Sequence, residues 1–184
     1  MPETGPAQPD FTVRQARGAD WPEVAMLHAL SWQSAYRGIY PDRFLDEEVV
    51  EDRRRWWRGM LPEMDGEDDA VFLAERGGRT IGFACIRRKA DPAGPLLDNL
   101  HVHPSCRRGG IGRCLIGAAA SWLVGKAPDA ALLLDVWAAN APARAFYRRL
   151  GAEEVERFEE PIPGGGTAPI VRMRWRRAIG LLSG

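Results

Sequence analysis

The feature that most constrains the fold of this chain is a glycine-rich turn between a strand-like segment and a helix-like segment. The apolar residues 96–102 come before the run Arg107-Arg108-Gly109-Gly110-Ile111-Gly112, and residues 113–124 continue with apolar side chains at helical spacing. Such a turn leaves backbone N–H groups unpaired at a helix N-terminus, where the helix dipole favours negative charge. Because arginines flank the glycines, the turn predicts a site for a phosphorylated cofactor.

Two common phosphate-binding loops do not fit these residues. A P-loop has Lys and then Ser or Thr after its last glycine, whereas Gly112 is followed by Arg113 and Cys114. The dinucleotide-binding fingerprint has Gly or Ala three residues after its second glycine, and that position is Leu115. What remains is the pattern Arg-x-x-Gly-x-Gly over residues 107–112.

Length and composition indicate one globular domain. We expect this domain over residues 11–178, a Pro-rich disordered tail over 1–10 and a C-terminal tail over 179–184. The 25 basic and 25 acidic residues cancel, so bulk charge gives no reason to expect nucleic-acid binding. No apolar run approaches the length of a membrane span, and the N-terminal residues lack the features of a signal peptide.

Cysteine and histidine usage indicates a reducing compartment and no metal centre. The 3 cysteines are an odd number without the spacing of a disulfide framework, which predicts reduced thiols in a cytoplasmic protein. His101, His103 and Cys106 lie close together in the sequence, but no second cluster of ligands accompanies them. We therefore expect no bound metal.

Hydrophobic patterning predicts alternating strands and helices. Strands are expected over residues 11–17, 71–75, 80–88, 96–102, 131–136, 153–160 and 170–176, and helices over 20–34, 46–60, 113–124 and 141–150. Asp20 is expected to cap the first helix, and Gly151 to end the last one. The arginines at 53–55 are expected to lie on an exposed helix, offset by nearby acidic residues.

Three further patterns agree with one known family. Residues 140–147 read Asn-Ala-Pro-Ala-Arg-Ala-Phe-Tyr, and residues 100–104, just before the glycines, read Leu-His-Val-His-Pro. Residues 32–39 carry Trp, then Ala-Tyr-Arg-Gly-Ile. Together with Arg-x-x-Gly-x-Gly, these patterns resemble the GCN5-related N-acetyltransferase (GNAT) superfamily. Its second cofactor motif is Asn-x-x-Ala-x-x-Phe-Tyr, and its strand end is Leu-Tyr-Val-x-Pro, so this chain has His where Tyr is frequent.

The resemblance implies both a fold and a cofactor. The fold is α+β, with α/β/α layers and a mixed, mostly antiparallel sheet of about seven strands that is splayed between the fourth and fifth strands. The cofactor is acetyl-CoA, a cosubstrate whose pantetheine arm fills the splayed gap, and no metal is involved. The residues implied to bind it are Leu100, His101, Val102, Arg107, Arg108, Gly109, Gly110, Ile111, Gly112, Arg113, Asn140 and Ala143. Asn140 has a second role open to it, that of helix N-cap.

The resemblance also implies catalytic residues. Tyr147 would protonate the coenzyme A thiolate, and the alternative is that it is a packed aromatic beside Phe146. Asp98 is the first choice for general base because carboxylates of this family often lie on that strand. His101 is the second choice, since imidazole titrates near neutral pH, and a chain of waters is the third. Leu96 stands where the family more often has Glu, which leaves the base open.

The acceptor side is less defined. Trp32 and Tyr36, with Tyr40, are expected to form an aromatic wall for an apolar or cationic substrate, and the alternative is that they are ordinary core aromatics. Glu159 and Glu160 would either attract a cationic amine or be a solvated strand end. The acceptor itself, a small-molecule or peptide amine, stays open.

The implied activity is the transfer of an acetyl group from acetyl-CoA to a primary amine by direct attack in a ternary complex. Two alternatives share the fold. One is a non-catalytic module that binds acyl-CoA or a partner protein, and the other is an acyltransferase that uses a longer acyl chain. Many relatives dimerise, so a homodimer is also open.

Overall fold

The computed structural model describes residues 10–64 and 66–182. The strands are β1 (Thr12–Gln15), β2 (Asp69–Arg76), β3 (Arg79–Asp91), β4 (Gly94–Val102), β5 (Leu132–Trp137), β6 (Glu153–Pro161) and β7 (Thr167–Trp175). The α-helices are α1 (Trp21–Ala35), α2 (Val49–Met60), α3 (Ile111–Lys126) and α4 (Ala141–Arg149), and a π-helical turn (Phe44–Glu48) leads into α2. The strands and helices expected from hydrophobic patterning are all present, in the expected order.

The strands form one 7-stranded sheet in the order β1-β2-β3-β4-β5-β7-β6. Neighbouring strands run antiparallel except β4 and β5, which run parallel. The expected mixed, mostly antiparallel sheet is therefore confirmed.

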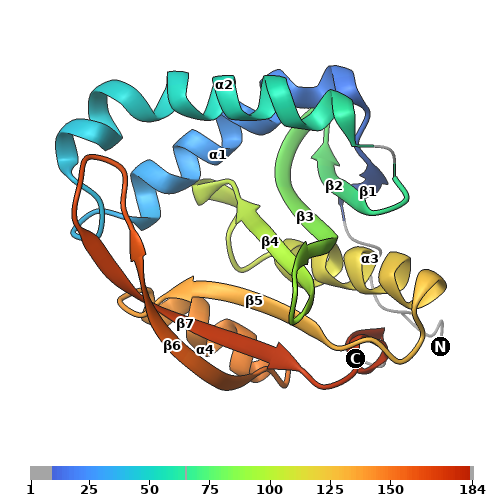
Figure 1. The fold of residues 1–184 in the computed structure, drawn as a ribbon. Coiled ribbons are helices and arrows are strands. Elements are labelled where there is room, and N and C mark those ends of the chain that lie inside the picture. The colour runs from blue at the N-terminus through green and yellow to red at the C-terminus, as the bar shows by residue number, and fades with distance from the viewer. Residues whose placement is uncertain (1–9, 65, 183–184) are drawn as a thin grey trace, which may run out of the picture.

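β4 and β5 part after a single point of contact. Leu96 of β4 pairs with Leu133 of β5, near the N-terminal end of each strand, and no other pair joins these strands in the described part of the chain. Figure 1 shows the two strands diverging toward their C-terminal ends. The expected splay is confirmed, and it leaves backbone hydrogen-bonding groups of both strands facing the split.

Helices cover both faces of the sheet (Figure 1). α1 and α2 lie side by side on one face, where their buried side chains pack on β2 and β3. α3 lies on the other face and buries the apolar side chains that recur every fourth residue, Ile111, Leu115, Ala119 and Leu123. α4 contributes Tyr147 to the same core. The α/β/α layering is therefore confirmed.

A β-bulge at Asp98 changes which side chains of β4 face each helical layer. Leu97 and Asn99 lie opposite consecutive residues of β3, so Asp98 is the extra residue. Leu97 packs into the core on the α3 side, whereas His101, four residues later, contacts α1 on the other face. In a regular strand these two residues would share a face.

The expected cap of α1 is wrong. Asp20 precedes this helix, but its side chain makes no capping hydrogen bond. Its carboxylate instead accepts hydrogen bonds from the Arg14 guanidinium (2.7 and 3.0 Å) and from the backbone N–H of Arg17 (2.7 Å). The guanidinium is the stronger partner, because it offers two charge-assisted bonds in a fixed fork.

The expected tails are only partly described. Residues 1–9 and 183–184 lie outside the described residues. Residues 179–182 belong to a 3-10 helix (Ala178–Leu182), in which Ala178 is buried and Leu181 packs against the α3 core.

Candidate active site

The glycine-rich turn connects β4 to α3 in a strained conformation. Gly110 is the N-cap of α3, and its φ is 76°. Arg108 has a φ of 69°, and within residues 10–64 and 66–182 it is the only residue other than glycine with a positive φ. Strained backbone of this kind is concentrated at ligand-binding sites.

The N-terminus of α3 has unpaired donors. In the described part of the chain, the backbone N–H groups of residues 110–113 donate no hydrogen bond, and the first such bond of the helix runs from Cys114 to the carbonyl of Gly110 (3.1 Å). The side chains of Arg107, Arg108 and Arg113 are exposed around them. The turn therefore combines the free N–H groups and the positive charge that a phosphate requires.

Gly112 lets the start of α3 approach α4 closely. A Cβ atom at this position would lie 3.3 Å from Cζ of Phe146. The absence of a side chain thus brings the two helices that follow β4 and β5 together at one end of the split.

Asn140 lies at the start of α4, just after β5. Its Oδ1 accepts a hydrogen bond from the N–H of Ala143 (3.2 Å), so the N-cap role is confirmed. Its Nδ2 makes no hydrogen bond to a described residue and is free for a ligand. Because β4 and β5 are parallel, their C-terminal ends share one edge of the sheet, and Asn140 and the glycine-rich turn flank the split there.

The C-terminal half of β4 keeps one backbone edge open. Residues 100–102 pair with residues 82–84 of β3 on one side. On the other side, no described strand pairs with them. An extended ligand in the split can therefore hydrogen-bond to Leu100, His101 and Val102 as an added strand would.

Tyr147 of α4 is buried in the core on the α3 side of the sheet. Its ring packs against Phe146 (ring centroids 5.3 Å apart) and Trp175 (6.0 Å), so it is a packed aromatic as well as a candidate acid. Burial raises its pKa, and the nearby Tyr36 raises it further. The phenol therefore keeps its proton at neutral pH, which is the form that a proton donor needs.

Asp98, at the bulge, is half-buried. Its carboxylate accepts a hydrogen bond from Nδ2 of Asn99 (3.0 Å). Burial raises its pKa above the usual value, while the nearby Arg87 and Arg53 oppose this rise. A carboxylate with a raised pKa is better suited to hold an abstracted proton than one exposed to water.

His101 is buried between β4 and α1. Its Nδ1 is hydrogen-bonded to Oγ of Ser31 (2.9 Å), and its ring lies against His28 with centroids 4.3 Å apart. Burial, together with Arg53 and Arg107, lowers its pKa to about 3. The imidazole is therefore neutral at physiological pH.

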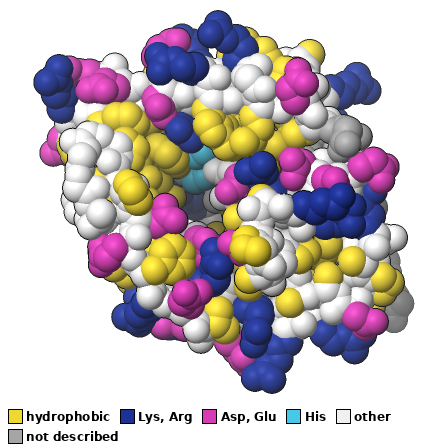
Figure 2. Space-filling view, viewed as in Figure 1, with side chains coloured by type: hydrophobic (Ala, Val, Ile, Leu, Met, Phe, Trp, Pro, Cys, Tyr) yellow, Lys and Arg dark blue, Asp and Glu magenta, His cyan; other side chains and the backbone are white. Residues whose placement is uncertain are grey.

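The side chains of the expected aromatic wall pack together with a fourth aromatic that the sequence did not indicate. Tyr40 is buried there beside Phe44 and Leu45, which agrees with the alternative of core aromatics. Trp32, Tyr36 and Tyr40 cluster with ring centroids 5.1 to 5.6 Å apart. Trp137, at the C-terminal end of β5, joins them 5.5 Å from Tyr40. Its position at the end of a strand bordering the split is the signal that could have found it. Figure 2 shows a hollow on this face, with a histidine side chain at its floor and apolar side chains around it.

Arg53 of α2 was expected on an exposed face, and that expectation is wrong. Its side chain is only 13% exposed, and its guanidinium carbon lies 4.3 Å from the ring centroid of Trp32. Helical spacing gives the reason, because Val49 and Trp57, four residues to either side, are both buried. Arg54 and Arg55 are exposed as expected.

Glu159 and Glu160 are exposed residues of β6. They pair with Pro169 and Ala168 of β7 and have no hydrogen bond or ion pair within the described residues. This agrees with a solvated strand end.

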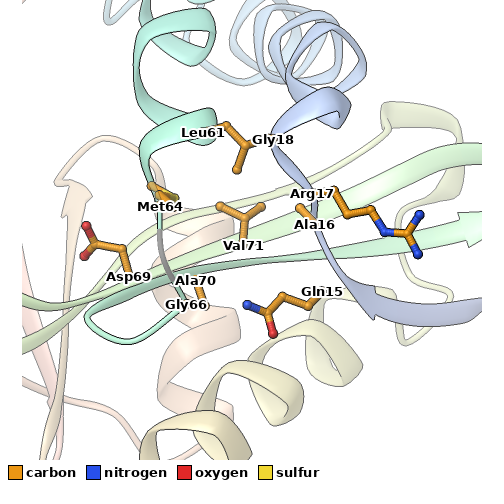
Figure 3. A pocket seen from close by; sticks show the side chains of 10 residues that line it. All are labelled: Gln15, Ala16, Arg17, Gly18, Leu61, Met64, Gly66, Asp69, Ala70 and Val71. Atoms are coloured by element: carbon orange, nitrogen blue, oxygen red, sulfur yellow. The ribbon is translucent and has the colours of Figure 1, made fainter.

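A separate cavity of about 220 Å³ lies where β1, β2 and the C-terminal end of α2 meet (Figure 3). It is lined by Gln15, Arg17, Met64 and Asp69, among others, and by none of the residues expected at the active site. It is therefore distinct from the split between β4 and β5.

The described residues contain no group of three or more His, Cys, Asp or Glu side chains that could hold a metal ion. His103 is instead hydrogen-bonded to Oγ of Ser105 (2.8 Å). In residues 10–64 and 66–182, no helix is long and apolar enough to cross a membrane.

Comparison with solved structures shows the same fold elsewhere. The PaiA N-acetyltransferase of Thermoplasma acidophilum, solved in complex with coenzyme A, superposes with a TM-score of 0.70 at 19% identity, over 89% of this chain and 97% of that one. The ribosomal-protein-alanine N-acetyltransferase of Brucella melitensis gives a TM-score of 0.66 at 22% identity, over 89% of this chain and 98% of that one.

Sequence comparison identifies the family. The probable N-acetyltransferase Rv2775 of Mycobacterium tuberculosis is 28% identical over 142 residues, which cover 76% of this chain and 78% of that protein. The uncharacterized N-acetyltransferase YuaI of Bacillus subtilis is 25% identical over 158 residues, 83% of this chain and 86% of that protein. The sequence model of the acetyltransferase (GNAT) family matches residues 20–152. The chain therefore belongs to the acetyltransferase (GNAT) family, and it is an acyltransferase.

Proposed function

We propose that this protein transfers the acetyl group of acetyl-CoA to a primary amine by direct attack in a ternary complex. The observation that carries the proposal is the split between β4 and β5, which opens from the Leu96–Leu133 pair toward the glycine-rich turn and Asn140. A thioester arm lying there would have phosphate donors at one end and the aromatic wall at the other.

The backbone supplies most of the cofactor site. The N–H groups of residues 108–113 bind the pyrophosphate, with Arg107 and Arg113 adding charge. The open edge of β4 at Leu100–Val102 pairs with the pantetheine arm, and Nδ2 of Asn140 donates to a pantetheine carbonyl. Coenzyme A in the PaiA N-acetyltransferase, which shares this fold, supports this cofactor.

Two side chains carry out the two proton transfers of the reaction. A bond forms between the amine nitrogen and the acetyl carbon, and the carbon–sulfur bond breaks. A backbone N–H of β4 near Leu100 supports the developing oxyanion, which is typically worth about 3 kcal/mol in the barrier. Asp98 takes the proton that the amine loses, and Tyr147 gives its proton to the departing thiolate.

The choice of Asp98 over His101 follows from their environments. Burial raises the pKa of Asp98 toward the working pH. The pKa of His101 is about 3, so its neutral imidazole is a weak base at the working pH. His101 therefore acts as a neutral wall residue, with Ser31 fixing its ring.

The test is binding and turnover measured together. Calorimetric titration with acetyl-CoA measures the cofactor, and thiol release in the presence of a panel of primary amines measures turnover. Gly110→Glu should abolish acetyl-CoA binding, because it places an acidic side chain in the phosphate site at a φ of 76°.

Gly78→Glu is the matched control, since Gly78 lies in the β2–β3 turn with a similar φ of 73° and open space around it. This variant should bind normally. Unchanged acetyl-CoA affinity in Gly110→Glu would remove the proposed cofactor site. Binding without thiol release for any amine would favour the non-catalytic alternative.

A further inference from the structure

Two buried nitrogen atoms between α1 and α2 have no hydrogen-bond partner among the described residues, Nε2 of His28 and Nε1 of Trp32. An indole N–H can only donate. His28 can be assigned as well, because its Nδ1 accepts a hydrogen bond from the indole N–H of Trp57 (2.9 Å). Burial, His101 and Arg53 all lower the pKa of His28, so its neutral ring carries its one proton on Nε2. Both orphan atoms are therefore donors.

Arg53 adds a third donor, and its positive charge is paired with the carboxylate of Asp52. Its Nε and Nη2 both bind Oδ2 of the neighbouring Asp52 (2.8 and 2.6 Å), while Nη1 makes no hydrogen bond to a described residue. The guanidinium carbon makes cation–π contacts with Trp32 and Trp56, 4.3 and 5.4 Å from their ring centroids.

The three donors belong to side chains that contact one another. The rings of His28 and Trp32 lie 4.7 Å apart, and the guanidinium of Arg53 covers the Trp32 ring. The ring of His28 also lies against His101, with centroids 4.3 Å apart, so the cluster borders β4. Buried donors left unpaired are costly, so three of them on neighbouring side chains indicate a ligand that brings acceptor oxygens.

We propose that the acceptor is a free amino acid, whose carboxylate binds Arg53 and the N–H groups of Trp32 and His28 while its amine faces Asp98. This rests on the proposed function. The apolar wall of Tyr36, Tyr40 and Trp137 contacts the side chain of the amino acid. Asp52 occupies Nε and Nη2 of the guanidinium, so the carboxylate of the amino acid accepts a hydrogen bond from the remaining Nη1.

The test compares acceptors that differ only in the carboxylate. Thiol release from acetyl-CoA is measured with L-phenylalanine, L-leucine and L-methionine, each against its amino alcohol, in which a hydroxymethyl group replaces the carboxylate. In every pair that is acetylated, kcat/KM should be about 10- to 100-fold higher for the amino acid. An amino alcohol that reacts as well as its amino acid would overturn the inference.

Arg53→Met supplies the second arm, because it removes the charge and keeps an unbranched side chain against Trp32. It should erase the preference within each pair by raising KM for the amino acid, with the KM for acetyl-CoA unchanged. Arg55→Met, at an exposed position of the same helix, should keep the preference. Thermal unfolding of both variants checks that the fold is retained, and Trp32→Phe, which removes the indole donor and keeps a smaller aromatic ring, should weaken the preference in part. An Arg53→Met variant that slows both members of a pair equally would also overturn the inference.

The outcomes separate this inference from the function on which it rests. Acetylation of other amines with no preference for a carboxylate would overturn the inference and leave the acetyltransferase intact. Failure of every amine, with acetyl-CoA binding retained or lost, would overturn both.

Discussion

The two sides of the split between β4 and β5 are built from different materials. On the cofactor side, the glycine-rich turn and the open edge of β4 offer backbone groups, and glycine identity is what leaves them accessible. On the acceptor side, α1, α2 and β5 contribute side chains that meet only in the folded protein. A site built from backbone groups can be recognised in one short sequence motif, whereas a site built from side chains draws on segments far apart in the sequence. The predictions below test this division, from the largest expected effect to the smallest.

Tyr147→Phe tests the one side chain on which the chemistry of the cofactor side depends. Removing the hydroxyl should lower kcat by about 10²- to 10⁴-fold, as is typical of a general acid. Acetyl-CoA affinity, measured by calorimetry, should hardly change, because the ring packing against Phe146 and Trp175 stays. Full activity would mean that Tyr147 is only a packed aromatic.

Asp98→Asn tests whether the carboxylate of Asp98 lowers the stability of the fold while it supports turnover. Turnover should fall at least tenfold, because the base is lost. Stability at neutral pH should rise. A carboxyl with a raised pKa binds its proton more tightly in the folded state, so the stability of the wild type falls as pH rises from the unfolded pKa through the folded one.

The measurements for Asp98 are thermal unfolding and kcat/KM, each against pH. The wild-type kcat/KM should fall as pH drops through the folded pKa of Asp98, and the variant should lack this acidic limb. Asp129→Asn, at an exposed position paired with Arg177, is the control and should leave activity unchanged. An Asp98→Asn variant that is less stable at neutral pH would contradict the account of this carboxyl.

Gly112→Val tests the close approach of α3 and α4. Its Cβ would press on Phe146, 3.3 Å away, so the variant should lose about 1–3 kcal/mol of stability and bind acetyl-CoA more weakly. Gly117→Val is the matched control, because Gly117 lies in the same helix with open space around it. Equal losses in chemical denaturation would show that only helix propensity is being measured.

Glu154→Gln tests the surface of the cofactor side and should have the smallest effect. Glu154 binds Arg144 and Arg148 of α4, which joins this helix to β6, and it also binds Arg157 of its own strand. Its pKa is lowered to about 2, and Arg144 is the largest cause. Its stabilising effect is present above the unfolded pKa and is lost as pH falls through the folded one. The variant should unfold about 2–4 °C lower at pH 7, with no difference from the wild type near pH 2. An unchanged midpoint at pH 7 would mean that the network stabilises nothing measurable.

The sequence predicted the fold around the candidate site well. The order of elements, the seven-stranded mixed sheet and its splay follow from hydrophobic patterning and from the resemblance to the family. The glycine-rich turn could be located because glycine and strand-to-helix position are visible in a single segment. Asn140 was likewise visible, since an N-cap requires only its own helix.

The acceptor side could not be predicted in the same way. Arg53 was assigned to an exposed helix because its neighbours balance its charge, and only the packing of α2 shows that it is buried. Trp137 joins the aromatic wall through tertiary contact with Tyr40, and its position at the end of β5 is the one local sign of this. The bulge at Asp98 depends on pairing with β3, so the face of the sheet on which each β4 side chain lies is set by both strands together. The expected cap at Asp20 failed for the same reason, since Arg14 lies in another element.

The single Leu96–Leu133 pair has a consequence for the lifetime of the protein. Strands β1–β4 and β5–β7 are two half-sheets that share one bridge, so their joint is short of backbone hydrogen bonds. If the pantetheine arm lies in the split, it completes the sheet as a strand that the chain does not encode. Ligand that binds only the folded state raises stability with its concentration, so acetyl-CoA should lengthen survival against proteolysis and heat. The abundance of the enzyme in a cell would then follow the supply of the metabolite that it consumes.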